Sequence, residues 1–400
     1  MRLRMAALTG ALLFALVGCT APDPEPPATA ETVIGDGHGE IAGAQELAEP
    51  ALHLTTVSPD GVVDHLELLD EETSTIAEID PIDDLVTNGR YLFGVRDGSV
   101  TVVDSGVWSW NHVDHFHYYE APSRVVGEVE GAGVPTVVAG ETGIGILFDG
   151  EAVLLDTAAL ADGEIVETFR IPVEQHQGLV VPLDSGAAVS EPDAAGDVQQ
   201  LRLIGDDGTE GDVIPCADAS GSIATNVGTV VGCADGALLF AGGDPAAVEE
   251  IALPEGAGPA ATSFDARKWR PTVAGTAGEN GIWLLDTRER TWEFIDAGEP
   301  IVAVSAVDDE AGHVIALAET GAVLVLADGA VVGRTEPLVS ASLADPDVAA
   351  GIGFVVDQQR VYLNGPLEQK MWEIAPADDG RIARTFDTAT QPLHVAGTGR

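Results

Sequence analysis

Cysteine and basic residues are scarce in this chain. Among its 400 residues there are three cysteines, and 18 lysines and arginines stand against 66 aspartates and glutamates. The formal net charge of −48 at pH 7 argues against nucleic acid and anionic membrane surfaces as partners, because both repel an acidic protein. The same charge favours solubility and raises the concentration of cations near the surface, although it identifies no binding site.

Long apolar runs are also missing. Arg2 and Arg4 precede an apolar segment at 6–17, and its length of about a dozen residues is typical of a signal-peptide core and too short to span a bilayer. The segment leads into the four residues 16–19 (LVGC), which are similar to the lipobox of bacterial lipoproteins. In a lipobox the peptidase cuts before the cysteine, which then carries the lipid. No later segment has the uninterrupted apolar length of a membrane span.

We therefore predict a lipoprotein signal peptide at 1–18, lipidation at Cys19 and a flexible tether over 19–50. The run 20–27 is rich in proline, as a structureless tether requires. An ordinary signal peptide with a coincidental cysteine is the alternative. The folded part, 51–400, is expected outside the cytoplasm, held by the lipid at the bacterial cell envelope.

Two cysteines remain once Cys19 is assigned to the lipid. In an oxidising compartment, an even remainder predicts one disulfide between Cys216 and Cys233 that closes a short loop. A cysteine-ligated metal site is the alternative. It is disfavoured because neither residue has a close cysteine or histidine companion.

Helical periodicity is almost absent as well. Short Val/Ile/Leu runs are interrupted by Gly, Asp and Pro about every ten residues, which is typical of an all-β domain. A weak repeat consists of a turn pair followed by an alternating apolar strand, and its copies lie near residues 61, 98, 150, 197, 236, 281, 321 and 359. Successive copies are 37 to 52 residues apart. A period of about 40–50 residues predicts a β-propeller.

Eight copies of the repeat predict eight blades. Seven blades are the alternative, if the first and last strands complete one shared blade. A pair of β-sandwiches would show no such regular period. The Asp-Gly pairs at several of the turns suit the positive φ angles of tight hairpins.

The chain lacks every common catalytic signature. There is no Gly-x-Ser-x-Gly elbow, no phosphate-binding loop and no catalytic cysteine. The glycines at 140–145 lie between strands and open no helix, so they do not predict a dinucleotide site.

One segment does carry a concentration of metal-ligating residues. His112, Asp114, His115 and His117 lie within six positions, flanked by aromatic residues. In an extended chain, His115 and His117 point to the same face, whereas His112 needs a bend to join them. Imidazoles with one carboxylate suit tetrahedral Zn²⁺. The segment lengthens one repeat to 52 residues and is therefore expected to project near the central channel. A solvated polar loop is the alternative, and Asp114 has the further option of orienting a histidine N–H.

The remaining histidines are less informative one by one. His176 opens a strand of a later blade and is a candidate to approach the same channel. His38 and Glu40 lie between the tether and the propeller, where they are candidates for a second or capture site. His65 and His313 lie within strand patterns and are expected to be structural or exposed.

Several segments together resemble the AztD family, the extracytoplasmic zinc metallochaperones of bacteria. The most specific are the histidine cluster and the stretch at 176–183 (HQGLVVPL). Further similarity lies at 102–104, 135–140, 146–150, 216, 232–236 and 394–400. The resemblance runs over most of the mature chain.

The resemblance implies a β-propeller that binds Zn²⁺ and hands it to the substrate-binding protein of a zinc ABC importer. Carried over by motif, the ligands are His112, Asp114, His115 and His117, with His176 as a long-range contributor. We expect a monomer. The chain departs from the family at Ser220, where family members often have a histidine. The family's mobile His/Asp-rich run is reduced in this chain to the neighbourhood of His38, so a second zinc site would be built differently.

Two functions of other classes stay open at this point. A metal-dependent propeller hydrolase or lactonase would need a general base next to an open coordination position. Glu120 and Glu141 are the candidates, although no acid–base constellation supports them. A propeller scaffold that binds a protein partner, with incidental histidines, is the third interpretation.

Overall fold

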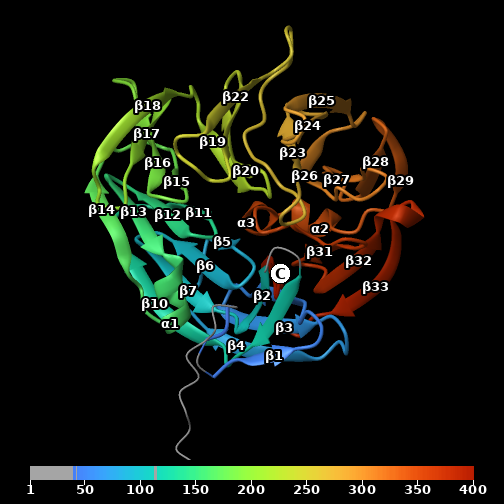
Figure 1. Ribbon diagram of the computed structural model, residues 1–400. Helices are drawn as coiled ribbons and strands as arrows, with labels where there is room; N and C mark the ends of the chain where they lie inside the picture. The colour runs from blue at the N-terminus through green and yellow to red at the C-terminus, as the bar shows by residue number, and fades with distance from the viewer. Residues whose placement is uncertain (1–38, 42, 112–114) are drawn as a thin grey trace, which may run out of the picture. The chain divides into compact units, whose positions relative to one another are not determined.

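The alternating apolar segments form short antiparallel strands in the computed structural model, which describes residues 39–41, 43–111 and 115–400. Within these residues the strands make nine sheets, eight of which are the blades of a propeller (Figure 1). The prediction of an all-β propeller with eight blades is confirmed. The predicted signal peptide, Cys19 and the first part of the tether lie outside the described residues.

Each blade is an antiparallel sheet whose strands follow one another from the centre of the ring outward. From its innermost strand, blade 1 contains β34 (His394–Thr398), β2 (His53–Val57), β3 (Val62–Glu67) and β4 (Thr73–Glu78). In the same order, blade 2 contains β5 (Asp84–Thr87), β6 (Tyr91–Arg96), β7 (Ser99–Asp104) and β10 (Arg124–Glu130). Blade 3 contains β11 (Thr136–Ala139), β12 (Gly143–Phe148), β13 (Glu151–Asp156) and β14 (Glu167–Pro172). Blade 4 contains β15 (Val180–Pro182), β16 (Ala187–Pro192), β17 (Val198–Ile204) and β18 (Glu210–Pro215).

The second half of the ring repeats the plan. Blade 5 contains β19 (Ser220–Ala224), β20 (Gly228–Cys233), β21 (Gly236–Ala241) and β22 (Val248–Ala252). Blade 6 contains β23 (Thr272–Ala277), β24 (Gly281–Asp286) and β25 (Thr291–Asp296). Blade 7 contains β26 (Ile301–Ala306), β27 (Val314–Ala318), β28 (Val323–Ala327) and β29 (Ala330–Arg334). Blade 8 contains β30 (Phe354–Val356), β31 (Val361–Gly365), β32 (Lys370–Ala375) and β33 (Arg381–Asp387).

Helices are few and short. They are α1 (Thr157–Asp162), α2 (Ser340–Leu343), α3 (Pro346–Ala349) and the 3₁₀ turn η1 (Pro376–Asp378). In the part of the chain that the structure describes, no helix has the length and apolarity needed to cross a bilayer.

Burial follows the position of a strand within its blade. The middle strands β7 and β12 are buried along their whole length, because both faces of a blade pack on neighbouring blades. The outermost strand β4 is mostly exposed. Gly98 and Gly150, in two of the Asp-Gly turns, have φ angles of 81° and 84°, so the turn chemistry expected from the sequence is present.

The ring closes in blade 1, where the last strand of the chain pairs with the first strand of the ring. The last strand, β34, pairs with β2, so that Val57 lies opposite His394 and His53 lies opposite Thr398. The hydroxyls of Thr55 and Thr398 are 2.9 Å apart across this seam and are buried. The last strand, β34, therefore does share a blade with β2, the first strand of the ring, and the total is still eight.

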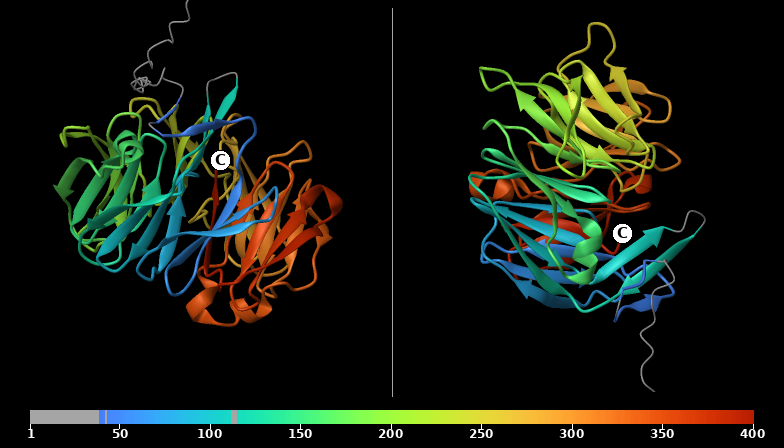
Figure 2. Two further views of the ribbon diagram at one scale, coloured as in Figure 1. Left: turned by 90° about the horizontal axis from the view of Figure 1, so that it is seen from below. Right: turned by 60° about the vertical axis from the view of Figure 1, so that its left-hand side comes forward.

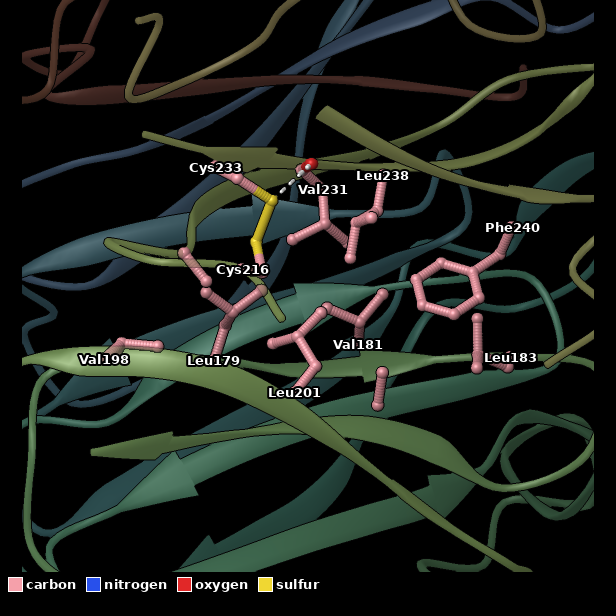
Figure 3. Packing of buried hydrophobic residues seen from close by; sticks show 12 residues of the cluster. Leu179, Val181, Leu183, Val198, Leu201, Cys216, Val231, Cys233, Leu238 and Phe240 are labelled. Atoms are coloured by element: carbon pink, nitrogen blue, oxygen red, sulfur yellow. Dashed lines mark hydrogen bonds between the residues drawn. A yellow bond between two sulfur atoms is a disulfide. The ribbon is translucent and has the colours of Figure 1, made fainter. Parts of the chain in front are cut away.

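A disulfide joins Cys216 and Cys233 (Figure 3). Cys216 follows the last strand of blade 4 and Cys233 ends a middle strand of blade 5, and both are buried in an apolar cluster that includes Val231 and Leu238. The predicted pairing is confirmed. A metal site at these cysteines is excluded, because both sulfurs are bonded to each other.

Candidate metal centre

The histidine cluster lies on a hairpin inserted into blade 2. Strands β8 (Val107–Asn111) and β9 (Phe116–Glu120) leave the blade after β7 and return to it at β10. This insertion accounts for the long repeat of 52 residues seen in the sequence. The hairpin projects from one face of the propeller (Figure 2). Its tip, with the predicted ligands His112 and Asp114, lies outside the described residues.

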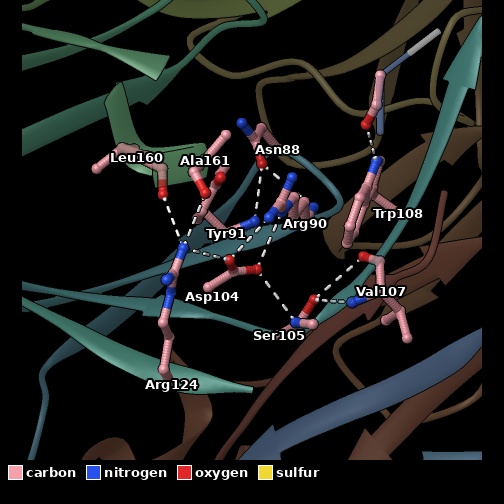
Figure 4. Close-up of polar contacts among 12 residues, drawn as sticks. Asn88, Arg90, Tyr91, Asp104, Ser105, Val107, Trp108, Arg124, Leu160 and Ala161 are labelled. Carbon is pink, nitrogen blue, oxygen red and sulfur yellow. Dashed lines mark hydrogen bonds and ion pairs between the residues drawn. The ribbon is translucent and has the colours of Figure 1, made fainter. Parts of the chain in front are cut away.

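A buried ion-pair network anchors the base of the hairpin (Figure 4). Asp104, the last residue of β7, is almost fully buried and accepts two hydrogen bonds from Arg90, of 3.0 and 2.8 Å. Arg124, where the chain re-enters the blade, lies 3.6 Å from the same carboxylate. A bidentate guanidinium–carboxylate pair holds planar geometry, so the two ends of the insertion start from fixed positions.

A tight turn starts the hairpin. The Gly106 φ angle is 82°, and its carbonyl oxygen accepts a 2.7 Å hydrogen bond from the amide of Ala121 on the returning strand. A Cβ at Gly106 would lie 2.2 Å from the carbonyl oxygen of Ala121. Glycine is therefore required both by the backbone angle and by the close approach of the two chains.

Aromatic packing and two hydrogen bonds set the hairpin beside the centre of the ring. Trp108 stacks on Tyr119 with ring centroids 5.3 Å apart, and the Arg90 guanidinium lies 3.8 Å from the Trp108 ring on which it packs. Trp108 Nε1 donates to the carbonyl oxygen of Gly39 at 3.2 Å. Ser109 Oγ donates to the carbonyl oxygen of Gly399, directly after the innermost strand of blade 1, at 2.8 Å. The insertion therefore lies next to the central channel, as expected from the sequence.

Two of the predicted ligands come together at the start of β9. His115 lies just before the strand and His117 is its second residue, and their Nε2 atoms are 3.0 Å apart. Their ring centroids are 4.8 Å apart. The His117 ring also packs near Trp110, which lies directly opposite it on β8, and near Tyr119. The alternation of an extended chain thus places both imidazoles on one face.

The second nitrogen of His117 contacts a residue that no sequence pattern indicated. His117 Nδ1 lies 2.6 Å from Glu46 Oε1. Glu46 is on β1 (Gln45–Leu47), which adds a third strand to the hairpin by pairing with β9. Because Glu46 precedes the cluster by 71 residues and lies at the end of the predicted tether, no local pattern connects the two.

His176 has different partners. It lies before β15, where its Nδ1 donates to the carbonyl oxygen of Glu174 at 2.7 Å and its Nε2 is 2.7 Å from the Ser190 hydroxyl. Both ring nitrogens are thus occupied within blade 4, and none of these contacts is with His115 or His117. Its role as a long-range ligand stays a prediction.

The other predicted positions are only partly described. His38 lies outside the described residues, while Glu40 is exposed and follows the Gly39 that contacts Trp108. Ser220 begins β19 in blade 5. No group of three or more His, Cys, Asp or Glu side chains is arranged to hold a metal within 39–41, 43–111 and 115–400. The ligand set as a whole stays a prediction, of which the structure describes one pair.

The two carboxylates considered as general bases lie in separate places. Glu120 is exposed at the end of β9. Glu141 lies in the turn after β11, where burial raises the pKa of its carboxyl, and the nearby Lys268 opposes this shift. Burial lowers the pKa of Lys268 to about 8, and its Nζ donates to the carbonyl oxygen of Arg400 at 2.7 Å. Glu141 is thus part of blade 3, whereas the histidine pair is on the hairpin inserted into blade 2.

The fold has solved relatives of the same architecture. Apo AztD from Citrobacter koseri matches with a TM-score of 0.72 and 21% identity, over 88% of this chain and 98% of that one. A second structure of Citrobacter koseri AztD matches with a TM-score of 0.74 and 20% identity over the same shares. The dihydro-heme d1 dehydrogenase NirN, in complex with DHE, gives a TM-score of 0.59 and 15% identity, over 90% of this chain and 78% of that one. No protein-family model matches the sequence, and no curated protein matches it either. At these identities the likeness shows the fold, which is AztD-like.

Proposed function

We propose that this chain, with its AztD-like fold, is a zinc metallochaperone that holds Zn²⁺ outside the cytoplasm and transfers it to the substrate-binding protein of a zinc ABC importer. The observation that carries the proposal is the convergence of His115 and His117, whose Nε2 atoms are 3.0 Å apart on a projecting hairpin. The resemblance of the sequence to the AztD metallochaperones supports it.

The spacing of the two nitrogens suits one zinc ion. Two nitrogens bound to a tetrahedral Zn²⁺ at about 2.0–2.1 Å from it are about 3.3 Å apart. The separation of 3.0 Å between His115 and His117 therefore needs to change by only a few tenths of an ångström. His112 and Asp114, which the sequence predicts as further ligands, are next to this pair in the chain.

Hydrogen bonding engages the Nδ1 of His117 with Glu46 and directs its Nε2 toward His115. A carboxylate only accepts hydrogen bonds, so His117 donates from Nδ1 to Glu46, and Nε2 is the nitrogen that would bind a metal. The Nε2 of His115 lies 3.0 Å from the Nε2 of His117, so both can face one ion. A nitrogen that binds Zn²⁺ must be deprotonated, so binding by this pair requires that neither Nε2 carries a proton.

The position of the pair suits transfer rather than catalysis. The hairpin is anchored at Asp104 and projects from the propeller, a position in which ligands of a partner would replace the histidines one at a time. The net charge of −48 raises the local concentration of cations. We therefore propose a role without catalysis, in which the chain carries the ion as cargo.

The proposal includes a place in the cell. Cleavage before Cys19 and lipidation of that residue would tether a monomeric propeller to the bacterial envelope, where a zinc importer takes up its ion. The run of prolines after Cys19 supports a tether of this kind.

Zinc titration of the mature chain and of a His115→Ala/His117→Ala variant tests the proposal. We expect the double variant to bind Zn²⁺ more weakly by over about 100-fold, beyond the 10–100-fold typical of losing a residue that only supports a ligand. His53→Ala, which removes a half-buried imidazole from β2, serves as the matched control and should bind as the wild type does. Equal zinc affinity of the double variant and the wild type would show that His115 and His117 do not hold the ion.

A transfer assay separates a chaperone from an enzyme. The zinc-loaded chain is mixed with a metal-free substrate-binding protein of a zinc importer in the presence of a chelator that captures free ions. If the substrate-binding protein takes up Zn²⁺ faster than it could from the free ions that the chelator leaves in solution, direct transfer is supported. Turnover of a lactone or ester panel by the zinc-loaded chain, with no transfer, would contradict the proposal.

A further inference from the structure

Strand β1 is short and buries little apolar surface that could hold it against its neighbour. It has three residues, Gln45–Leu47, and its one strand partner among the described residues is β9. Gln45 and Glu46 are exposed and Leu47 is half-buried. Elements with little buried apolar surface open at low free-energy cost. Its pairing is therefore sensitive to any single strong contact.

Glu46 makes that contact. In the register of the two strands, Glu46 lies opposite Tyr119, and His117 is two residues before Tyr119 on the same strand and therefore on the same face. Glu46 and His117 are thus diagonal neighbours across the two strands, and Glu46 Oε1 lies 2.6 Å from His117 Nδ1. The His117 side chain is 16% exposed and that of Glu46 is 58% exposed, so a largely covered imidazole is paired with an accessible carboxylate.

We propose that Glu46 is a positioning residue for the metal ligand His117, and that occupation of the site and the pairing of β1 with β9 strengthen each other. This inference rests on the proposed function, because it requires a metal at His117 Nε2. It assigns to a residue of the predicted tether a part in holding the cargo.

The physical reason is the coupling between the two nitrogens of one imidazole. A carboxylate that accepts from Nδ1–H fixes the tautomer and the ring orientation and makes Nε2 a stronger donor to a metal. Conversely, a cation on Nε2 draws electron density from the ring and makes Nδ1–H a better hydrogen-bond donor to Glu46. Because binding free energies are reciprocal, each event favours the other by the same factor.

The consequence is a strand whose attachment depends on the cargo. With Zn²⁺ bound, β1, β9 and β8 form a firmly paired three-stranded sheet. Without it, the pairing of Gln45–Leu47 is weaker, and the backbone edge of β9 opens more often. A recipient protein would thus meet a different hairpin surface on the loaded chain and on the empty one.

Zinc affinities of Glu46 variants test the positioning role. Glu46→Gln keeps an acceptor oxygen but loses the charge, and Glu46→Ala loses both. We expect Zn²⁺ to bind about 10-fold more weakly to Glu46→Gln and 10–100-fold more weakly to Glu46→Ala, the range typical of carboxylates that support a histidine ligand. Glu49→Gln, the same change at an exposed residue of the same segment, is the matched control and should bind as the wild type does.

Cobalt distinguishes a positioning residue from a ligand. The visible absorption of Co²⁺ bound in place of Zn²⁺ depends on the atoms that coordinate it. We expect the same bands in the wild type and in Glu46→Gln, because the ligand set is unchanged. A change in the intensity of these bands would make Glu46 itself a ligand and would overturn the positioning role.

Hydrogen exchange of the full chain tests the coupling. We expect Zn²⁺ to slow the exchange of amides in 45–47 and of their partners on β9 in the wild type and in Glu49→Gln. In Glu46→Ala this zinc-dependent protection should be lost. Circular dichroism confirms that each variant is folded, since β1 lies outside the eight blades.

Each outcome separates the inference from the function on which it rests. If Glu46→Ala binds Zn²⁺ like the wild type while the His115→Ala/His117→Ala variant does not, the inference is wrong and the zinc function stands. If exchange of 45–47 is the same with and without Zn²⁺ in the wild type, the coupling is wrong. If the wild type itself takes up no Zn²⁺, the proposed function fails, and the inference fails with it.

Discussion

His65 and His117 are both on strands, yet their imidazoles have opposite surroundings. His117 is on a projecting hairpin beside Glu46, with one nitrogen directed at His115. His65 is buried in blade 1 next to His53, with ring centroids 4.7 Å apart. Sequence alternation predicted the shared face of His115 and His117. It could not rank the burial of single histidines, because burial depends on the neighbouring blade.

Burial makes His65 a source of acid sensitivity. Desolvation, with a smaller effect of nearby His53, lowers the pKa of His65 from 6.5 to about 3. The folded chain thus binds fewer protons than the unfolded chain below pH 6.5, and stability falls as the pH drops from 6.5 to about 3. The full effect is up to about 5 kcal/mol, and above pH 6.5 there is no loss.

Urea unfolding at several pH values measures this effect. Between pH 6.5 and 4, the free energy of unfolding of the wild type should fall more steeply than that of His65→Leu, which has no titratable group at this position. His313→Gln, at a histidine paired with Asp309, provides a comparison outside blade 1. Parallel slopes for the wild type and His65→Leu would contradict the assignment.

At the scale of elements, the inserted hairpin depends on one backbone position. Gly106→Ala forces a side chain into a left-handed turn and against the Ala121 carbonyl oxygen. We expect a loss of about 2–4 kcal/mol in the free energy of unfolding and a weaker zinc site, because the base of the hairpin shifts. Gly258→Ala, where a Cβ meets nothing within 4 Å, should change stability by less than about 0.5 kcal/mol. Equal effects of the two variants would show that the turn is not required.

Most elements of the ring could be predicted, and the reason is periodic turn chemistry. Asp60-Gly61 and Asp97-Gly98 mark hairpins 37 residues apart, and the longest interval, the 52 residues from Gly98 to Gly150, contains the inserted hairpin. Strand β1 could not be predicted. Gln45–Leu47 has no alternating apolar pattern, and its pairing partner is far along the chain, so the contact of Glu46 with His117 appears only in three dimensions.

At the scale of the whole molecule, a single disulfide supplements the packing between blades. Removal of Cys216–Cys233 by a double substitution to serine should lower the free energy of unfolding by about 3 kcal/mol, as expected for a loop formed by a sequence separation of 17. Guanidinium unfolding measures the loss. The zinc stoichiometry should be unchanged, because both sulfurs are bonded to each other. A loss of bound Zn²⁺ in the folded variant would assign the cysteines a role in the site.

The seam in blade 1 also determines the order in which the ring can form. Thr55 and Thr398 are 343 positions apart, so β2 lacks its inner neighbour until the last residues of the chain are available. The blades between them fold from local hairpins, whereas the pairing of β2 with β34 joins the two ends of the ring and is expected to come late. Until then, β2 presents an unpaired edge that another chain can match. The interval before closure is thus the stage of folding at which the chain is most exposed to aggregation.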